Sequence, residues 1–222
     1  MAVAATRALG NLWHFGKDVI TTSDVALRLR QTRSAASHML ARLAAAGLVR
    51  RVRRGLWSLE PEIDPLVLPE HLTAPFPAYV SFQSALQIHG MISQIPQVIH
   101  VASLSPTRRI KTTVGTFSIH RLSPSFFGGF ETLEGGVRLA RPEKALLDTL
   151  YLTPARSRLF AALPEVELPD TFSEQEARRW LAKVPPGLRR LAMQQRLDAI
   201  LRTQRRAAMP LRARARRAGG RA

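Results

Sequence analysis

The sequence predicts an α+β protein: an N-terminal winged helix-turn-helix domain, then an α+β domain with a small antiparallel sheet and a helical C-terminal region. Three observations lead to this prediction. Residues 21–59 have the order helix, helix, two-stranded hairpin. Residues 97–139 contain short segments rich in β-branched residues and separated by turn residues. Residues 153–208 are mostly helix-forming, with a capping box at residues 173–176.

The 222 residues are enough for two small domains, and a proline-rich segment suggests where they divide. Residues 60–77 hold five prolines and four acidic residues, so they cannot form a long helix or a central strand. We therefore expect a DNA-binding domain at 1–60, an ordered linker at 61–77, a second domain at 78–205 and a basic, disordered tail at 206–222.

The charge of the chain is strongly positive and unevenly placed. The formal net charge is +17. Residues 1–59 carry ten Lys/Arg against two acids and residues 178–222 carry fourteen against one, whereas residues 60–177 carry nine against thirteen. Such a balance favours a polyanionic partner, with nucleic acid first and an anionic membrane second. The absence of cysteine excludes disulfides, zinc fingers and thiol catalysis.

The first sixty residues have the pattern of a three-helix module with a wing. A first helix is expected over residues 5–16. Thr21 or Thr22 can cap the next helix, and Thr32 can cap a third that buries Ala36, Leu40 and Leu43. Gly47 stands where that helix would end. Leu48–Val52 and Leu56–Leu59 flank Arg53-Arg54-Gly55 and predict a hairpin with a basic tip.

This geometry predicts a DNA interface. With Ala36, Leu40 and Leu43 inward, the outer face of the third helix carries small, polar and cationic side chains, which suit a helix that enters the major groove. Arginines in the hairpin suit phosphate or an adjacent minor groove. The alternative is an ordinary amphipathic helix beside a solvated basic hairpin. The predicted DNA-binding residues are Thr32, Arg33, Ser34, Ser37, His38, Arg42, Arg50, Arg51, Arg53 and Arg54.

The second domain is expected to alternate short strands and helices. Ser81 can cap a helix that ends near Gly90. Residues 97–104 and 113–122 predict strands with a basic turn at 106–111 between them, and residues 126–139 predict a hairpin. Pro142 stands in the first turn of a largely apolar, buried helix. Ser173 and Glu176 predict a capping box. A later helix is expected to place one stripe inward, widened by Leu197, Ile200 and Leu201; the stripe consists of Leu188, Leu191, Ala192, Gln195, Ala199 and Arg202.

Several strings of the second domain resemble a known family. YVSFQSALQIHG (79–90), IPQVIHVAS (95–103), TFSIHRL (116–122), FFGG (126–129) and LARPEKALLDTLYL (139–152) are similar to the AbiEi antitoxins, over roughly residues 20–152. These are the antitoxin halves of type IV toxin–antitoxin systems, which act in phage defence. The positions that carry the resemblance include Tyr79, Ser81, Ser84, His89, Glu143, Lys144, Asp148 and Tyr151.

The resemblance implies two activities. One is repression of the protein's own operon by binding inverted repeats in double-stranded operator DNA. The other is protection, through the C-terminal domain, against a nucleotidyltransferase-like toxin, with or without stable contact. An alternative is a regulator whose second domain binds a protein or ligand unrelated to a toxin.

An enzyme is the remaining alternative, and the motifs do not favour it. Seven polar residues could be assembled into a nucleic-acid-processing site: His89, Arg108, Arg109, His120, Glu143, Lys144 and Asp148. However, Glu143 and Lys144 are adjacent at the start of a helix, and the chain has no glycine-rich phosphate loop and no His-Glu-x-x-His motif. We therefore expect no catalysis, no cofactor and no metal. Since no stretch is long and apolar enough to span a membrane, a cytoplasmic protein is expected.

Overall fold

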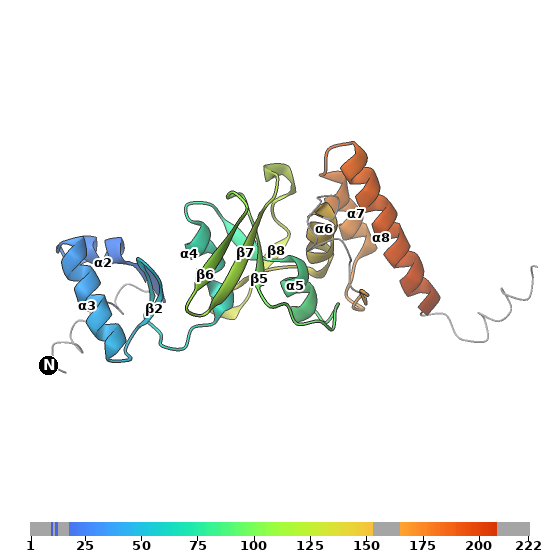
Figure 1. The fold of residues 1–222 in the computed structure, drawn as a ribbon. Helices are drawn as coiled ribbons and strands as arrows, with labels where there is room; N and C mark the ends of the chain where they lie inside the picture. Colours follow the sequence, from blue (N-terminus) through green and yellow to red (C-terminus); the bar gives the residue numbers. More distant parts are fainter. Residues whose placement is uncertain (1–9, 11, 13–17, 153–164, 208–222) are drawn as a thin grey trace, which may run out of the picture.

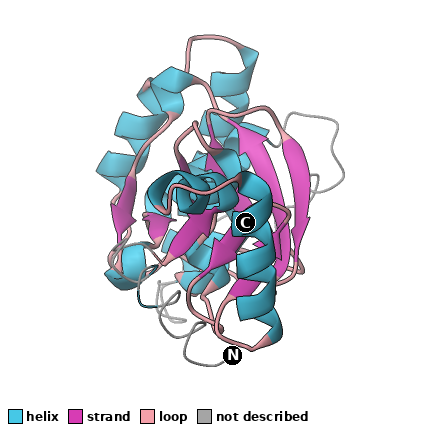
Figure 2. Cartoon of the chain, turned by 90° about the vertical axis from the view of Figure 1, so that its left-hand side faces the viewer, coloured by secondary structure: helices cyan, strands magenta, loops and turns pink. Residues whose placement is uncertain are grey.

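The computed structural model describes residues 10, 12, 18–152 and 165–207 of the chain. Figure 1 shows three parts in a row: a head with α2 and α3, a central sheet, and a group of helices that contains α6, α7 and α8. In Figure 2, which faces the head end, the elements of the successive parts overlap along the line of sight. We call residues 18–59 the head and the described residues from 60 onward the body.

The head is a helix-turn-helix with a three-stranded sheet. Helix α2 (Thr22–Arg28) begins at Thr21, which forms a capping box with Asp24, and α3 (Arg33–Ala45) begins at Thr32, whose hydroxyl accepts from the amide of Ala35. Arg30 has a left-handed backbone (φ 50°) in the turn between them. The predicted helix over residues 5–16 lies almost wholly outside the described residues.

The wing forms as predicted, with one addition. Strands β2 (Arg50–Arg53) and β3 (Leu56–Ser58) pair antiparallel around a turn in which Gly55 has a positive φ of 80°. Strand β1 (Val19–Thr21) adds to the other edge of β3, which gives the order β1-β3-β2. Residues from the helices and from the sheet share one core, which includes Val25, Ala36, Leu40, Leu43 and Trp57.

The body is built on a six-stranded sheet in the order β6-β7-β5-β4-β9-β8. The strands are β4 (Ala78–Val80), β5 (Ile99–Ser103), β6 (Arg108–Thr112), β7 (Gly115–Arg121), β8 (Phe130–Thr132) and β9 (Arg138–Ala140). The α+β fold class is therefore confirmed. The sheet is larger than expected and mixed, because β5 pairs parallel with β7 and β4 pairs parallel with β9.

Helices and the head cover opposite faces of this sheet. Helices α5 (Phe82–Ile88) and α6 (Pro142–Leu152) pack with Tyr79, Ala102 and Leu139. Val101, Phe117 and Ile119 point to the other face and pack with Val19, Val52 and Leu56 of the head. Neighbours in β5, such as Val101 and Ala102, thus serve different cores, as the two-residue period of a strand requires.

Residues 61–77 are ordered and packed rather than extended as a free spacer. The 3-10 turn η1 (Pro65–Val67) leads into the short helix α4 (Pro69–Thr73). Ile63, Leu68 and Leu72 are buried in the same core that joins the head to the sheet. Glu70 forms an ion pair with Arg138 of β9 at 2.5 Å. The segment therefore helps to hold the head on the body, and the division into domains at these residues stays a prediction.

Three elements of the body differ from expectation. The basic segment at 106–111 is not a turn: residues 108–112 form the edge strand β6, and the turn follows at Thr113 and Val114. Two short 3-10 turns, η2 (Pro124–Phe126) and η3 (Glu134–Gly136), flank the predicted hairpin strand β8. Residues 165–173 are not helical, and residues 153–164 and 208–222 lie outside the described part.

The C-terminal helices are α7 (Glu174–Ala182) and α8 (Leu188–Ala207). Helix α8 buries Met193, Leu197 and Leu201, whereas Leu188 and Leu191 are 87% and 52% exposed. The predicted stripe was thus wrong along most of its length, because Gln195, Ala199 and Arg202 are exposed as well. Half of the predicted capping box forms: the Ser173 hydroxyl accepts from the amide of Glu176 at 3.2 Å. The amide of Ser173 donates to Glu143 of α6 at 2.6 Å instead of to Glu176.

Candidate nucleic-acid interface

Helix α3 presents a polar, cationic face to solvent. Ala36, Leu40 and Leu43 are buried, which leaves the predicted base-reading side chains exposed along the opposite face. These are Ser34, Ser37, His38 and Arg42, with Thr32 and Arg33 at the first turn. Short hydroxyls let a helix approach base edges closely, and arginine can bond bidentately to guanine. The N-terminal part of α3 therefore has the chemistry of a recognition helix.

The wing places its arginines around the hairpin tip. Arg51, Arg53 and Arg54 are exposed, whereas Arg50 is half-buried and donates to the carbonyl of Pro61 at 3.3 Å. The guanidinium of Arg51 lies over the ring of Trp57, 5.6 Å from its centroid. Trp57 is itself fixed, because its indole N–H donates to the hydroxyl of Thr22 at 2.9 Å. Arg53 and Arg54 are therefore the wing arginines best placed to contact phosphate, and Arg51 lies beside them.

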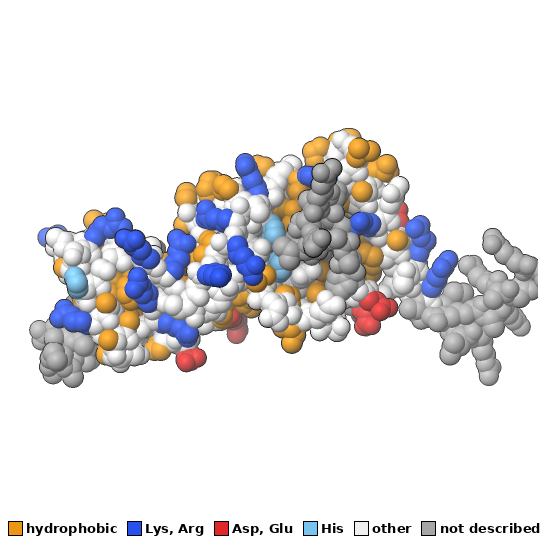
Figure 3. Space-filling model, viewed as in Figure 1, with side chains coloured by type: hydrophobic (Ala, Val, Ile, Leu, Met, Phe, Trp, Pro, Cys, Tyr) orange, Lys and Arg blue, Asp and Glu red, His pale blue; other side chains and the backbone are white. Residues whose placement is uncertain are grey.

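Basic side chains extend from the head onto the body. Figure 3 shows lysine and arginine spread over one face of the head and over the adjoining part of the sheet. On the body, Arg108, Arg109 and Lys111 are exposed on β6. A surface of one charge raises the local concentration of a polyanion and speeds its association.

The residues that carry the family resemblance meet in the interior of the body. Lys144 and Asp148, one turn apart on α6, form a fully buried ion pair. The same carboxylate accepts from the hydroxyl of Ser81 at 2.7 Å and from that of Tyr79 at 3.0 Å. Lys144 also donates to the Tyr79 hydroxyl at 3.0 Å. Burial raises the pKa of Asp148 and lowers that of Lys144, and each charge opposes the shift of the other.

The prediction that the Ser81 side chain caps α5 is therefore wrong. Ser81 precedes α5, but its hydroxyl makes no capping bond, because it is directed to Asp148. Phe82, the first residue of that helix, has a positive φ of 55° and is fully buried. The sharp change from β4 to α5 thus brings Tyr79 and Ser81 together over α6. These motif residues are core residues, and they satisfy one another as buried polar groups generally do.

The remaining motif residues also make internal contacts. Ser84 accepts from the amide of His100 at 2.9 Å, and the ring of Tyr151 stacks on Phe126. His89 ends α5, where Nε2 lies 2.7 Å from the carbonyl of Ala140. Glu143 accepts a hydrogen bond from the amide of Ser173. Of the polar set that was considered for catalysis, the structure thus joins Lys144 to Asp148 in a buried ion pair, whereas His89 and Glu143 bond to other partners.

Sequence reasoning did not single out a buried histidine pair. His100 of β5 and His120 of β7 stack with Nδ1 of the first 3.3 Å from Nε2 of the second. Burial lowers the pKa of each to about 4, with Arg109 adding to the shift of His100 and His100 adding to that of His120. The parallel pairing of β5 and β7, which places these residues together, could not be inferred from either strand alone.

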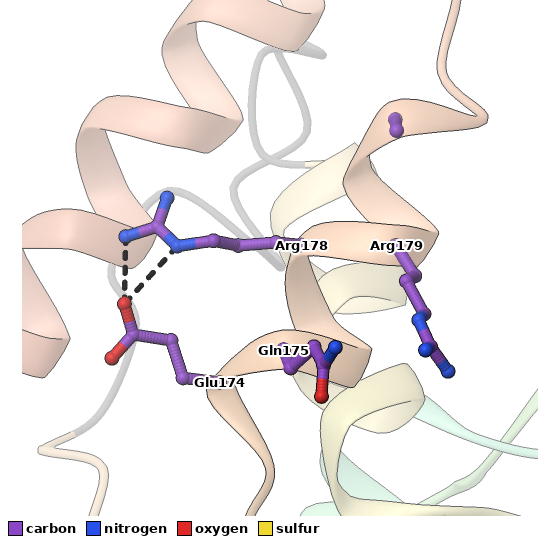
Figure 4. A pocket seen from close by; sticks show the side chains of 5 residues that line it. Glu174, Gln175, Arg178 and Arg179 are labelled. Carbon is purple, nitrogen blue, oxygen red and sulfur yellow. Dashed lines mark hydrogen bonds and ion pairs between the residues drawn. The ribbon is translucent and has the colours of Figure 1, made fainter.

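A surface pocket lies on α7, and residues of its lining form ion pairs with one another and with α8. It is lined by Glu174, Gln175, Arg178, Arg179 and Ala182 (Figure 4). Arg178 binds Glu174 at 2.8 Å and Asp198 of α8 at 3.0 Å. Charged residues of the pocket lining therefore join α7 to α8 through ion pairs. Among the described residues, no group of three or more His, Asp or Glu is placed to hold a metal ion. Within the same residues, no helix meets the length and hydropathy needed to cross a bilayer.

Comparison with known protein families finds a match at the N-terminus. Residues 1–55 match the MarR family. The chain matches no curated protein. The match spans the helix-turn-helix and most of the wing, whose exposed polar helix and basic hairpin are described above. The chain therefore carries a MarR-family winged helix-turn-helix domain at its N-terminus, the module of a DNA-binding transcription regulator.

Proposed function

We propose that this protein is a transcriptional repressor that reads operator DNA with α3 and contacts phosphate with its wing. The observation that carries this proposal is the pairing of an exposed Ser34, Ser37, His38 and Arg42 face with the exposed wing arginines beside it. Ser37, His38 and Arg42 would contact base edges, whereas Arg33, Arg53 and Arg54 would contact phosphate. Repression follows if the bound site overlaps the promoter.

The operator is proposed to be an inverted repeat in the promoter of the protein's own operon. This step rests on the AbiEi resemblance over residues 20–152. Two copies of the protein would occupy two half-sites, whose separation is set by the helical repeat of DNA at about 10 bp or a multiple of it. The surplus of Lys and Arg in the head favours such binding and makes it salt-dependent.

The body is proposed to counteract a nucleotidyltransferase-like toxin. The first support is the same resemblance. The second is that four of the residues that carry it form one hydrogen-bonded network in the core between β4, α5 and α6; they are Tyr79, Ser81, Lys144 and Asp148. In this proposal the motif residues shape the body, and surface residues outside the motif meet the toxin or its target. The protective role would thus depend on the fold that the network maintains.

A footprint tests the repressor proposal. The intact protein is incubated with duplex DNA from upstream of its own coding sequence, and protection from nuclease is compared with that of a scrambled duplex at the same salt concentration. We expect two protected, inverted half-sites with centres about 10 bp or a multiple apart. Equal protection of both duplexes would contradict sequence-specific repression.

A rescue experiment tests the antitoxin proposal separately. The toxin encoded by an adjacent gene is expressed in cells with the full-length protein, both from foreign promoters, so that repression plays no part. We expect growth to be restored by the intact chain and by Arg42→Ala, because Arg42 lies on the exposed face of α3. Failure of the intact chain to restore growth would contradict the antitoxin role and leave the repressor proposal standing.

A further inference from the structure

The wing is joined to the body along the outer edge of β2. One side of β2 pairs with β3, and the backbone carbonyls on its other side accept hydrogen bonds from Thr113 of the body. The amide of Thr113 donates to the carbonyl of Val52 at 3.0 Å, and its hydroxyl donates to the carbonyl of Arg51 at 2.7 Å. Thr113 lies in the turn between β6 and β7, so the tip of this body hairpin meets the wing.

The point of contact is a bulge in the wing. Arg51 pairs with Trp57 and Arg53 pairs with Leu56, so Val52 is an extra residue between two paired positions. A bulge redirects the side chain and carbonyl of the extra residue and increases the local twist of the strand. The Val52 side chain is fully buried in the core that contains Ile110 and Phe117 of the body. Val52 is thus held by the body through its carbonyl and through its side chain.

The proposed phosphate contacts flank this fixed residue. Arg51 and Arg53 stand on either side of Val52, Arg54 follows, and all three are exposed. A hairpin with a free outer edge could twist about its strands, and its arginines would lose more freedom on binding DNA. Contacts that fix a binding loop in advance reduce that loss and raise the affinity. The same contacts set the direction in which the three guanidinium groups leave the wing.

We propose that Thr113 is a positioning residue for DNA binding: it holds the bulge of the wing at Val52 and thereby directs the wing arginines toward phosphate. The inference rests on the proposed function of those arginines. It makes the body a working part of the DNA reader, although Thr113 need not touch DNA. It also provides a direct route by which a partner bound at the β6–β7 hairpin would alter the affinity for DNA.

Thr113→Val tests this proposal, because valine keeps the β-branched shape and the amide but removes the hydroxyl donor. We expect the affinity for operator DNA to fall about fivefold, because a wing that is not fixed in advance loses more conformational freedom when it binds. The slope of log K against log salt should become shallower by about one unit, since one phosphate contact is lost. The matched control is Thr132→Val, the same change at an exposed position of β8, the opposite edge of the sheet. This control should leave affinity and slope unchanged.

A double variant separates positioning from a general structural effect. In the Arg53→Ala, Arg54→Ala background, Thr113→Val should cause a smaller loss of affinity than in the wild type, because two of the three side chains that it directs are gone. The proposal is overturned if Thr113→Val binds with wild-type affinity and salt slope, or if its loss is undiminished in that background. If the wild-type protein shows no preference for its promoter, the repressor proposal fails, and the salt slope on a random duplex still decides the role of Thr113.

Discussion

At the scale of single residues, Lys144 explains why the motif of the second domain looked functional. Its ammonium group is fully buried and lies 4.0 Å from the centroid of Phe126 and 5.1 Å from that of Trp180. A buried charge is tolerated only when it is paired and bonded, and Asp148 and Tyr79 provide those partners. Lysine and aspartate four residues apart on a helix are the usual spacing of an ion pair, but the sequence alone does not show that this pair is buried.

Lys144→Met tests the structural role. Methionine is unbranched and only one atom shorter than lysine, but it leaves Asp148 buried without its cation. We therefore expect the free energy of unfolding to fall by about 3–5 kcal/mol. Lys183→Met is the control: Lys183 also lies over Trp180, at 3.6 Å from the centroid, but its side chain is exposed. Urea denaturation of both variants measures the difference. Equal losses would contradict the account of the buried pair.

The histidine pair makes stability depend on pH. In the folded protein the pKa of His100 and of His120 is about 4, below the usual 6.5, so the unfolded chain binds more protons between these values. The contribution of the neutral pair is fully present above pH 6.5 and is lost as the pH falls towards 4, by up to about 3 kcal/mol for each histidine. Urea midpoints at pH 7, 6 and 5 measure this fall. His120→Gln should flatten it, and an unchanged slope in that variant would contradict the assignment.

At the scale of elements, the FFGG string is explained by the contact between the η2–β8 segment and α7. A Cβ atom on Gly129 would lie 2.8 Å from two ring atoms of Trp180 and 2.9 Å from Cγ of Lys144. Gly129 also has a positive φ of 74°. The absence of a side chain therefore lets Trp180 close over Lys144, and α7 becomes part of the cover of the buried network.

Gly129→Ala should destabilise the protein more than the same change at Gly136. Both residues have a positive φ, of 74° and 79°, so alanine is strained at both positions. At Gly136 an added Cβ meets no atom within 4 Å, whereas at Gly129 it meets Trp180 and Lys144. Overpacking should add about 1–3 kcal/mol to the loss at Gly129. Thermal or urea denaturation of the two variants measures this difference, and similar losses would show that the contact is not tight.

Local signals in the sequence predicted the elements that they encode. The hydroxyls of Thr21 and Thr32 mark the starts of α2 and α3, and the apolar period of Ala36, Leu40 and Leu43 identifies the inner face of α3. The wing and helix α6 followed from turn residues and from Pro142 in the same way. The exposed face of α3 was therefore predictable, because once the buried residues are identified, the remaining residues of the helix face solvent.

Contacts between distant segments were not predictable. Strands β1 and β4 have three residues each, too few to show alternation, and they exist because neighbouring strands pair with them. The edge strand β6 was taken for a turn because its basic residues resemble loop composition. The bond from Ser81 to Asp148 and that from Ser173 to Glu143 cross the fold, and each replaces a local cap that the sequence favours.

At the scale of the whole molecule, the head and the body share one core. Val19, Val52 and Leu56 of the head pack with residues of the sheet and with Leu68 and Leu72 of the connecting segment. A winged module of this size has little core of its own. The body thus supports the DNA reader physically, and the two proposed roles, repression and protection, are carried by parts that are fixed to one another.

The most direct test of the central claim compares affinity for promoter DNA with affinity for a random duplex, at one salt concentration, for the wild type, Arg42→Ala and Arg53→Ala. Arg42 lies on the exposed face of α3 and Arg53 lies in the wing. We predict that Arg42→Ala loses about 1–3 kcal/mol of discrimination between the two duplexes, because a base contact is lost. Arg53→Ala should weaken binding to both duplexes about equally. Equal losses on both duplexes for both variants would contradict base reading by α3.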